Sequence, residues 1–540
     1  MQLDPIKIKS KQNLIEDYKS NNAFIMNYFD YPLANESYSN RVDDLNSRSF
    51  KREQLSEVLY QINKDWDAPH ATLENINRLR EPNSVVVIGG QQAGLLTGPM
   101  YTVHKIISIL QLAKEQEEQL NIPVVPVFWI AGEDHDFEEI NHVYMMADSE
   151  MKKVKFPQHV VTKQPVSDIQ IDKVKAEQWL GQIFVQMNET TYTKQLYKEV
   201  SECLAQSNTF VDFFARFIFQ LFHKEGLVLV DSNHRLLRQL ESEFFVEMIM
   251  KQPEISAGVY ASFKELALHH YPVDLQVDKQ DGNLFYHLHQ ERILLMRDDE
   301  GNWVGKQNEV KLSTEELINI AKEKPYLLSN NVMTRPLMQE LVFPSLAFVG
   351  GLGEISYWSV LKRAFHALNM KMPVVVPRLS FTYVNHKIDQ LMEKYTISMR
   401  EALTGRIEVS KMEWLKVQST PPIALLFENV KQAITNAHHP LRAVARDLRG
   451  DLEEIATTNL QRIHREIDFL EKKMNHAIMD KHAHGIREFT FINSALYPYG
   501  GYQERIWNPL PLLNEYGKAI IQELVDANCS LYDEHYIVRL

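Results

Sequence analysis

Short apolar runs that end in glycine or acidic residues recur along the chain, and each leads into a stretch with helical periodicity. The runs lie at 85–88, 124–130, 227–230, 346–351 ("LAFVGG") and 372–380 ("MPVVVPRLS"). None of them alternates with polar residues, which is typical of strands that are buried on both faces of a parallel sheet. The pattern predicts an open, doubly wound α/β core whose ligands bind at the carboxyl ends of the strands.

The spacing of these runs is uneven. The gaps between the second and third runs and between the third and fourth are far longer than an ordinary crossover connection needs, so both must hold inserted elements. The later gap contains "NLFYHLHQERILLMRDDEGNWVGK", in which residues 298–302 indicate a hairpin turn between two strands. We expect inserts at about 145–215 and 255–330.

Residues 441–478 carry an apolar seam with charged residues between its members. A stripe this narrow and long is typical of a coiled coil, and the alternative is one long helix packed on its own domain. We expect an antiparallel helical arm, with the preceding segment "PPIALLFENVKQAITNAHHPLRAVARDL" as partner and a homodimer interface on the arm. The seam residues are Leu441, Val444, Leu448, Leu452, Ala456, Leu460, Ile463, Ile467, Leu470, Met474 and Ile478.

These patterns divide the chain into three parts. The core is expected at 1–384, interrupted by the two inserts, and the helical coiled-coil domain at 385–497. A C-terminal segment at 498–540 is expected to return to the core. A length of 540 residues is compatible with this division.

The composition narrows the class of protein. A net charge of -13 argues against a nucleic-acid-binding protein, which would carry a basic surface. The chain has two cysteines, far apart, so a disulfide framework or a cysteine zinc site is not expected and a reducing compartment fits best. Apolar runs stay short of a membrane span, and the first residues contain no signal-like segment. We expect a cytoplasmic protein.

The stretch "VVVIGGQQAGLLTGPMYTVHK" (85–105) combines a strand end, four glycines and two glutamines. It lacks the GKS or GKT ending of a P-loop, and the G-x-G-x-x-G pattern of a dinucleotide-binding loop is absent as well. Gln91 and Gln92 therefore favour a loop for a polar substrate, with Thr97 as the cap of the next helix. Of His104 and Lys105, at most one can face the ligand directly. The alternative is a glycine-rich turn with a satisfied histidine.

The stretch "FWIAGEDHDFEEINH" places Glu133, Asp134, His135 and Asp136 directly after a buried strand. His135 beside carboxylates can serve as a general base, and the same carboxylates can hold Mg²⁺. For Glu138 and Glu139 we expect only a solvated start of a helix, which the helix dipole favours.

A third group follows the fourth and fifth strands. Arg335 precedes a proline, so we expect an extended backbone that presents its guanidinium to a carboxylate or phosphate. Glu354 stands at the start of a helix and either caps it or binds an amine, and Tyr357 follows on the same face. Arg378 ends the fifth strand as a second anion anchor or in a plain salt bridge. Signatures of covalent hydrolases and zinc peptidases do not occur.

Five long motifs resemble the bacillithiol synthase family, the cysteine-adding enzymes of bacillithiol biosynthesis. The resemblance spans nearly the whole chain and departs at Leu352, where the family has Gly-Pro-Gly-Glu. The motifs are "GGQQAGLLTGPMYTVHKIISILQLAK", "PVFWIAGEDHDFEEINH", "SNNVMTRPLMQELVFPSLAFVGGLGEISYW", "MPVVVPRLS" and "QERIWNPLPLLNEYG". The resemblance implies a Rossmann-like core similar to cysteine ligases and class I aminoacyl-tRNA synthetases, with connecting-peptide inserts and a coiled coil.

The implied reaction is addition of L-cysteine to glucosaminyl malate as an amide of the sugar amine. ATP is expected to activate the cysteine, although the HIGH and KMSKS signatures are absent and no nucleotide-binding residue is assigned. The hypothesis is that Gln91, Gln92, Thr97, Tyr101 and His104 hold the glucosaminyl malate. Arg335 or Arg378 pairs with its malate, and Asp134 or His135 takes the amine proton. Glu354 and Tyr357 complete the predicted site. The alternatives are a Mg²⁺-dependent nucleotidyltransferase and a coiled-coil scaffolding protein.

Overall fold

The computed structural model describes residues 1–8, 12–147, 150–419, 422–531 and 535–540. The chain divides into two compact units. Unit 1 comprises residues 1–145, 152–382 and 504–538, and unit 2 comprises 146–151, 383–503 and 539–540. Among the described residues, no helix combines the length and apolar character that a membrane span requires.

The centre of unit 1 is a five-stranded parallel sheet. Its strands are β2 (Val85–Gln91), β3 (Val124–Ile130), β6 (Val228–Asp231), β12 (Ser345–Gly350) and β13 (Val374–Pro377), in the order β13-β12-β2-β3-β6. Nearly every residue of the five strands is buried, which explains why they read as unbroken apolar runs. The predicted α/β fold is confirmed.

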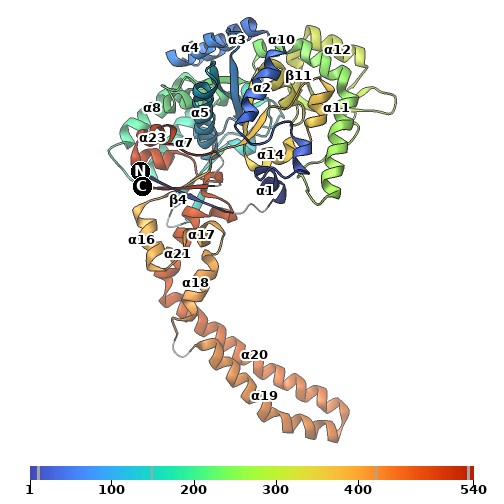
Figure 1. Ribbon diagram of the computed structural model, residues 1–540. Helices are drawn as coiled ribbons and strands as arrows, with labels where there is room; N and C mark the ends of the chain where they lie inside the picture. Colours follow the sequence, from blue (N-terminus) through green and yellow to red (C-terminus); the bar gives the residue numbers. More distant parts are fainter. Residues whose placement is uncertain (9–11, 148–149, 420–421, 532–534) are drawn as a thin grey trace. The chain divides into compact units, whose positions relative to one another are not determined.

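The strand order creates a switch point between β2 and β12. From β2 the chain builds outward through β3 and β6, and it then returns to the other side of β2 to form β12 and β13. Helix α5 (Tyr101–Leu120) follows β2 and packs on β2, β3 and β12 (Figure 1). In open α/β sheets, ligands bind at such a switch point, beside the carboxyl ends of the strands.

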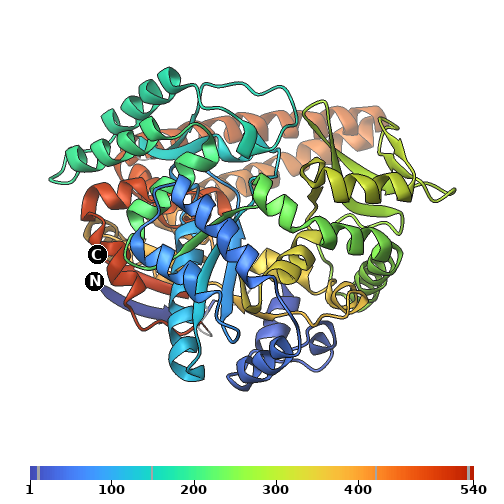
Figure 2. The same ribbon diagram turned by 90° about the horizontal axis from the view of Figure 1, so that it is seen from above.

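Two sets of inserted elements extend this core. Between β3 and β6 lie β4 (His142–Ala147), β5 (Glu150–Lys155), α7 (Lys173–Val185), α8 (Thr193–Gln206) and α9 (Phe210–Leu221). Between β6 and β12 lie α11 (Ser242–Leu268), α12 (Thr314–Glu323) and an antiparallel sheet. Figure 2 shows α7–α9 in teal and the antiparallel sheet in olive as separate groups.

The antiparallel sheet has the order β10-β9-β8-β7-β11. Its strands are β7 (Asp281–Leu288), β8 (Glu291–Arg297), β9 (Trp303–Gly305), β10 (Lys311–Leu312) and β11 (Leu328–Asn330). The turn at 298–302 joins β8 to β9, and the Asp298 amide donates to the Asn302 carbonyl at 3.0 Å. The predicted hairpin is therefore confirmed.

The C-terminal segment of unit 1 returns to the core elements. Strand β15 (His535–Arg539) lies between β1 (Gln2–Ile6) and β14 (Phe381–Val384), and the Tyr536 amide donates to the Ser380 carbonyl at 2.8 Å. Before it, α22 (Leu510–Tyr516) and α23 (Ala519–Val525) also belong to unit 1. This return places residues from position 504 onward beside the central sheet.

Unit 2 is helical. It contains α16 (His386–Lys394), α17 (Met399–Leu403), α18 (Ile407–Lys416) and α21 (Ala483–Leu496), together with the long helices α19 (Ile423–Leu448) and α20 (Gly450–Lys481). The last two form an antiparallel hairpin, in which His438 contacts Asn459 at 3.1 Å and Thr435 contacts His464 at 3.1 Å (Figure 1). The family-level expectation of a long antiparallel coiled coil is confirmed.

The predicted path of the apolar seam is wrong in one respect. The sequence predicts one continuous stripe from 441 to 478, but the chain turns at Arg449, whose extended backbone separates α19 from α20. Leu441, Val444 and Leu448 are 65%, 58% and 73% exposed, so they do not pack against α20. Leu460 of the predicted seam is buried within the hairpin, together with Phe427 and His438 of α19.

Candidate active site

Lys105 connects the ends of β2 and β12. Its ammonium group donates to the Gly90 carbonyl at 2.6 Å and to Gln91 Oε1 at 3.1 Å, and it forms an ion pair with Glu354. Lys105 is only 1% exposed, and burial lowers its pKa although Glu354 opposes this effect. The three contacts engage all three ammonium hydrogens, so Lys105 fixes its neighbours and has none left for a ligand.

Gly89 has no side chain, which leaves space for the Val349 carbonyl of β12 and for the side chain of Lys105. A Cβ atom there would lie 2.7 Å from the Val349 carbonyl oxygen of β12 and 3.4 Å from Cδ of Lys105. Glu354 stands in the first turn of α14 (Leu352–Trp358), and its Oε2 accepts the Gly351 amide at 2.8 Å. Both contacts of Glu354 use Oε2, and 22% of its side chain is exposed. The carboxylate is therefore held in place with part of it facing solvent.

Arg335 lies in α13 (Thr334–Val342). Its Nη2 donates to the Tyr357 hydroxyl at 2.6 Å and its Nη1 to Gln339 Oε1 at 3.3 Å. Burial alone lowers the pKa of Arg335, but Tyr357 and Glu354 raise it, and the net direction is upward. Within the part of the chain that the structure describes, no carboxylate forms an ion pair with this guanidinium. Arg335 is thus held by neutral groups and keeps its charge available to an anion.

Arg378 has a different environment. Its guanidinium forms a two-point pair with Glu504, with Nη1 2.8 Å from Oε2 and Nη2 2.6 Å from Oε1. His104 Nδ1 lies 2.7 Å from Glu504 Oε2, and burial lowers the pKa of this histidine. Burial raises the pKa of Glu504, but Arg378 and His104 lower it well below its ordinary value. This closed group joins α5, β13 and the C-terminal segment.

Gln92 connects the loop after β2 to the loop after β3. Its Nε2 donates to Asp134 Oδ2 at 2.7 Å and to Glu139 Oε2 at 2.8 Å. The His135 amide donates to Asp134 Oδ1 at 2.8 Å. Burial and Arg292 lower the pKa of His135, and Asp134 opposes them, so the imidazole is neutral near pH 7. The two neighbouring glutamines thus have different partners: Gln91 accepts a hydrogen bond from Lys105, and Gln92 donates to Asp134 and Glu139.

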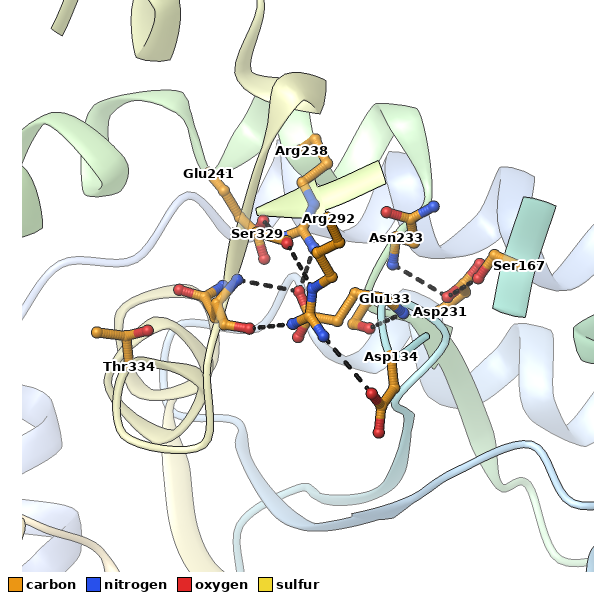
Figure 3. Close-up of polar contacts among 12 residues, drawn as sticks. Glu133, Asp134, Ser167, Asp231, Asn233, Arg238, Glu241, Arg292, Ser329 and Thr334 are labelled. Atoms are coloured by element: carbon orange, nitrogen blue, oxygen red, sulfur yellow. Dashed lines mark hydrogen bonds and ion pairs between the residues drawn. The ribbon is translucent and has the colours of Figure 1, made fainter. Parts of the chain in front are cut away.

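A buried ionic network lies beside these loops, and Figure 3 shows its side chains. Glu133 pairs with Arg238, which also pairs with Glu241 at 2.7 Å, and Glu133 accepts the Asn330 amide at 3.1 Å. At the end of β6, Asp231 Oδ1 accepts the Ser167 hydroxyl at 2.9 Å, and burial raises the pKa of Asp231 to about 7. The network fixes the ends of β3 and β6.

Comparison with known proteins identifies the family. The model described as "Bacillithiol biosynthesis BshC, N-terminal Rossmann-like domain" matches residues 1–379, and "Bacillithiol biosynthesis BshC, C-terminal coiled-coil domain" matches residues 381–540. The chain belongs to the BshC family. It is 42% identical over 544 residues to a protein of Oceanobacillus iheyensis and 39% identical over 541 residues to one of Bacillus licheniformis, with 100% of each chain covered. A relative from Geobacillus thermodenitrificans is 38% identical, with 97% of each chain covered.

These relatives of the BshC family carry the name "Putative cysteine ligase BshC". The resemblance drawn from the five motifs is therefore confirmed, and the chain is a ligase of bacillithiol biosynthesis. The Rossmann-like and coiled-coil domains that the resemblance implied are confirmed as well.

The predicted site residues of this BshC-family chain fall into three groups. Gln91, Glu354, Arg335 and Tyr357 lie at the switch point, directly bonded to Lys105 or to one another. Gln92, Asp134 and His135 form the second group. Arg378 and His104 meet at Glu504, and the Arg378 guanidinium lies 5.7 Å from the Tyr101 ring. Burial raises the pKa of Tyr101.

The structure corrects several of these expectations. Thr97 does not cap the next helix, because α5 begins at Tyr101 after Met100, and Thr97 is 0% exposed with φ +74°. His104 is also 0% exposed, so neither side chain lines an open surface. Arg335 is helical rather than extended, because Pro336 stands in the first turn of α13, where a helix tolerates proline. Glu139 is more than a solvated helix start, since it accepts from Gln92.

Sequence reasoning missed four residues at these strand ends. The sequence patterns assign no separate role to Lys105 and do not single out Asp231. Glu504 stands in the quoted "QERIWNP" motif, and Arg292 stands in the insert. A charged residue inside a long family motif was the only available signal for Glu504. Among the described residues, no group of histidine, cysteine and acidic side chains is arranged to hold a metal ion.

Proposed function

We propose that this ligase joins L-cysteine to glucosaminyl malate, with an amide bond to the sugar amine. The proposal is supported by membership of the BshC family and by the names of the relatives. The observation that carries it is the Arg335 guanidinium, which neutral partners hold beside Glu354 at the switch point of the sheet. A glycoside with a carboxylate-bearing group and an amine needs such a cation and such an acceptor in one place.

In this proposal the malate carboxylates bind Arg335 and the sugar amine approaches Glu354. Arg378 is the weaker choice for the malate, because Glu504 already engages both sides of its guanidinium. Tyr357 shares its hydroxyl with Arg335 and can donate its own proton to the ligand. Gln91, held by Lys105, contributes neutral hydrogen bonds to the sugar.

Amide formation requires a neutral amine and an activated carboxyl group. We infer that ATP activates the cysteine carboxyl, because a free carboxylate does not acylate an amine under mild conditions. The C–N bond then forms as the bond to the activating group breaks, and the ammonium proton passes to a base. His135, whose pKa is lowered by burial, and Asp134 are the candidates for that base. Mg²⁺ would accompany the nucleotide, and its ligands are not assigned.

The proposed activity is tested with purified protein, glucosaminyl malate, L-cysteine and ATP. We expect a thiol product whose mass equals the sum of the two substrates less one water, and whose formation requires ATP. A sugar amine labelled with ¹⁵N should leave its label in the amide of the product. Absence of this product with active, folded protein would exclude the proposed reaction.

We also propose that two copies of the chain associate through α19 and α20. The exposed apolar residues of α19 follow heptad steps of three and four, as in Leu441, Val444 and Leu448. Leu426 and Val430 continue the same stripe and are 45% and 40% exposed. An apolar stripe that does not pack inside its own hairpin is typical of an interface with a second chain.

A further inference from the structure

Arg292 is a buried arginine that the second insert contributes to the end of β3. It stands on β8, and its Nε donates to Ser329 Oγ at 3.1 Å while its Nη2 donates to the Asn330 carbonyl at 2.5 Å. The guanidinium carbon lies 3.8 Å from the centre of the Phe285 ring. Ser329 also contacts His287 Nε2 at 2.8 Å. These contacts fix the guanidinium in one orientation, as Figure 3 shows for Arg292 and Ser329.

The remaining side of this guanidinium faces Asp134 and His135. Nη1 lies 3.5 Å from Asp134 Oδ1 and 3.4 Å from His135 Nδ1. Charge-assisted hydrogen bonds are ordinarily about 2.7–2.9 Å long, so neither contact is closed. Asp134 is held by Gln92 and by the His135 amide, and 32% of its side chain is exposed. The guanidinium and the Asp134 carboxylate thus form a long ion pair, and the exposed part of Asp134 faces solvent.

The neighbouring Arg238 is a buried arginine whose charge is balanced by two close carboxylates. Glu133 and Glu241 both pair with Arg238, and these carboxylates raise its pKa although burial lowers it. The pKa of Arg292 is lowered by burial, which Glu133 and Asp134 only partly offset. A buried charge whose ion pair is long is only partly compensated, and an incoming anionic group adds to that compensation.

We propose that Arg292 and Asp134 bind the amino acid substrate as a zwitterion, with its carboxylate on Arg292 and its ammonium group on Asp134. The inference rests on the proposed function and assigns the site of its second substrate. An amino acid fits better than a phosphate, because the Asp134 and Glu133 carboxylates repel a multiply charged anion. The antiparallel sheet of the insert then has a role in the reaction, since β7, β8 and β11 supply and hold Arg292.

The test is a set of calorimetric titrations of the full-length protein with three thiols. L-Cysteine carries both charged groups, cysteamine lacks the carboxylate, and 3-mercaptopropionate lacks the amine. Wild-type protein should bind L-cysteine at least about tenfold more tightly than either analogue, because each analogue can make only one of the two charged contacts. This comparison needs no variant, so misfolding cannot obscure it.

Two variants test which side chain binds the carboxylate of L-cysteine and which binds its ammonium group. Arg292→Met should lose at least about tenfold in affinity for L-cysteine and should no longer distinguish it from cysteamine. Asp134→Asn should lose the preference for L-cysteine over 3-mercaptopropionate. The matched control is Arg297→Met, which removes another arginine of β8 that stacks on Trp303 at 4.7 Å and donates to Thr314 Oγ1 at 2.9 Å. This control should bind all three thiols as the wild type does.

Equal binding of L-cysteine and cysteamine by the wild type would overturn the proposal, and so would unchanged L-cysteine affinity in Arg292→Met. These outcomes differ from a failure of the proposed function. That function fails if the wild type binds L-cysteine through Arg292 but forms no thiol product. The inference fails if product forms and Arg292→Met retains the wild-type KM for cysteine.

Discussion

At the scale of single residues, Lys105 determines the geometry between β2 and β12. It is buried, and it bonds to Gly90, Gln91 and Glu354 at once. Because no other described side chain forms an ion pair with Glu354, loss of Lys105 would leave that partly buried carboxylate without its ion-pair partner. Lys105 therefore links the stability of unit 1 to the order of the proposed site.

Lys105→Met should lower the free energy of unfolding by about 3 kcal/mol, the lower end for a broken buried pair, because Glu354 is partly exposed. Urea denaturation measures this change. Lys114→Met is the matched control, since Lys114 is exposed on the same helix α5 and should change stability little. Equal stability of the Lys105 variant and the wild type would show that the pair contributes nothing.

The raised pKa of Asp231 predicts that the free energy of unfolding depends on pH. Burial raises its pKa to about 7, whereas an aspartate in an unfolded chain ionises near pH 4. Between these values the folded protein holds a proton that the unfolded chain has lost, so this group lowers stability as pH rises. Asp231→Asn cannot ionise and should therefore gain stability relative to the wild type between pH 5 and pH 8. Urea unfolding at both pH values tests this, and an equal difference at the two values would contradict it.

The residues of the site differ in how far a sequence reveals them. Gln91, Asp134 and Glu354 directly follow apolar runs, so their place at strand ends could be predicted. Glu504 lies 400 positions from its partner His104, and Arg292 lies 157 positions from His135, so no local pattern indicates either contact. The contact of Arg292 forms only when the insert folds, and the contact of Glu504 forms only when the C-terminal segment returns to the core.

At the scale of elements, strand β2 is buried except at Gln91, and its backbone lies close to that of the neighbouring strands. Gly89→Ala should lower the free energy of unfolding by about 1–3 kcal/mol, because the added methyl group would overlap the Val349 carbonyl. Gly181→Ala on α7 is the contrasting control: nothing lies within 4 Å of its added carbon, and alanine favours the helix by about 0.5–1 kcal/mol. Thermal unfolding of both variants checks the pair, and equal melting temperatures would contradict the account.

The sequence pattern predicts some elements correctly, such as the parallel strands, and fails for others, such as the turn between α19 and α20. The five parallel strands are buried on both faces, so their apolar runs predict them directly. The apolar pattern at 441–478 predicts a single stripe because the exposed apolar residues of α19 and the hairpin residues of α20 have the same spacing. Only the backbone at Arg449 reveals that the chain turns there.

At the scale of the whole molecule, the exposed stripe of α19 predicts association. Replacing Leu441 and Val444 together by Glu should convert a dimer to a monomer, because charges in an apolar interface lose their hydration without gaining partners. Sedimentation velocity at several concentrations measures the change. Met250→Glu is the control, since Met250 is 59% exposed on α11 in unit 1. A wild-type monomer at high concentration would refute the proposed dimer.

We propose above all that the switch point of the sheet selects glucosaminyl malate through Arg335. The most direct measurement compares kcat/KM for glucosaminyl malate and for glucosamine, which lacks the malate, in the wild type and in Arg335→Met. We predict that the wild type prefers glucosaminyl malate and that Arg335→Met reduces this preference by about ten- to a hundredfold, as expected for loss of a charge-assisted pair of about 1.5–3 kcal/mol. An unchanged preference in Arg335→Met would contradict the account.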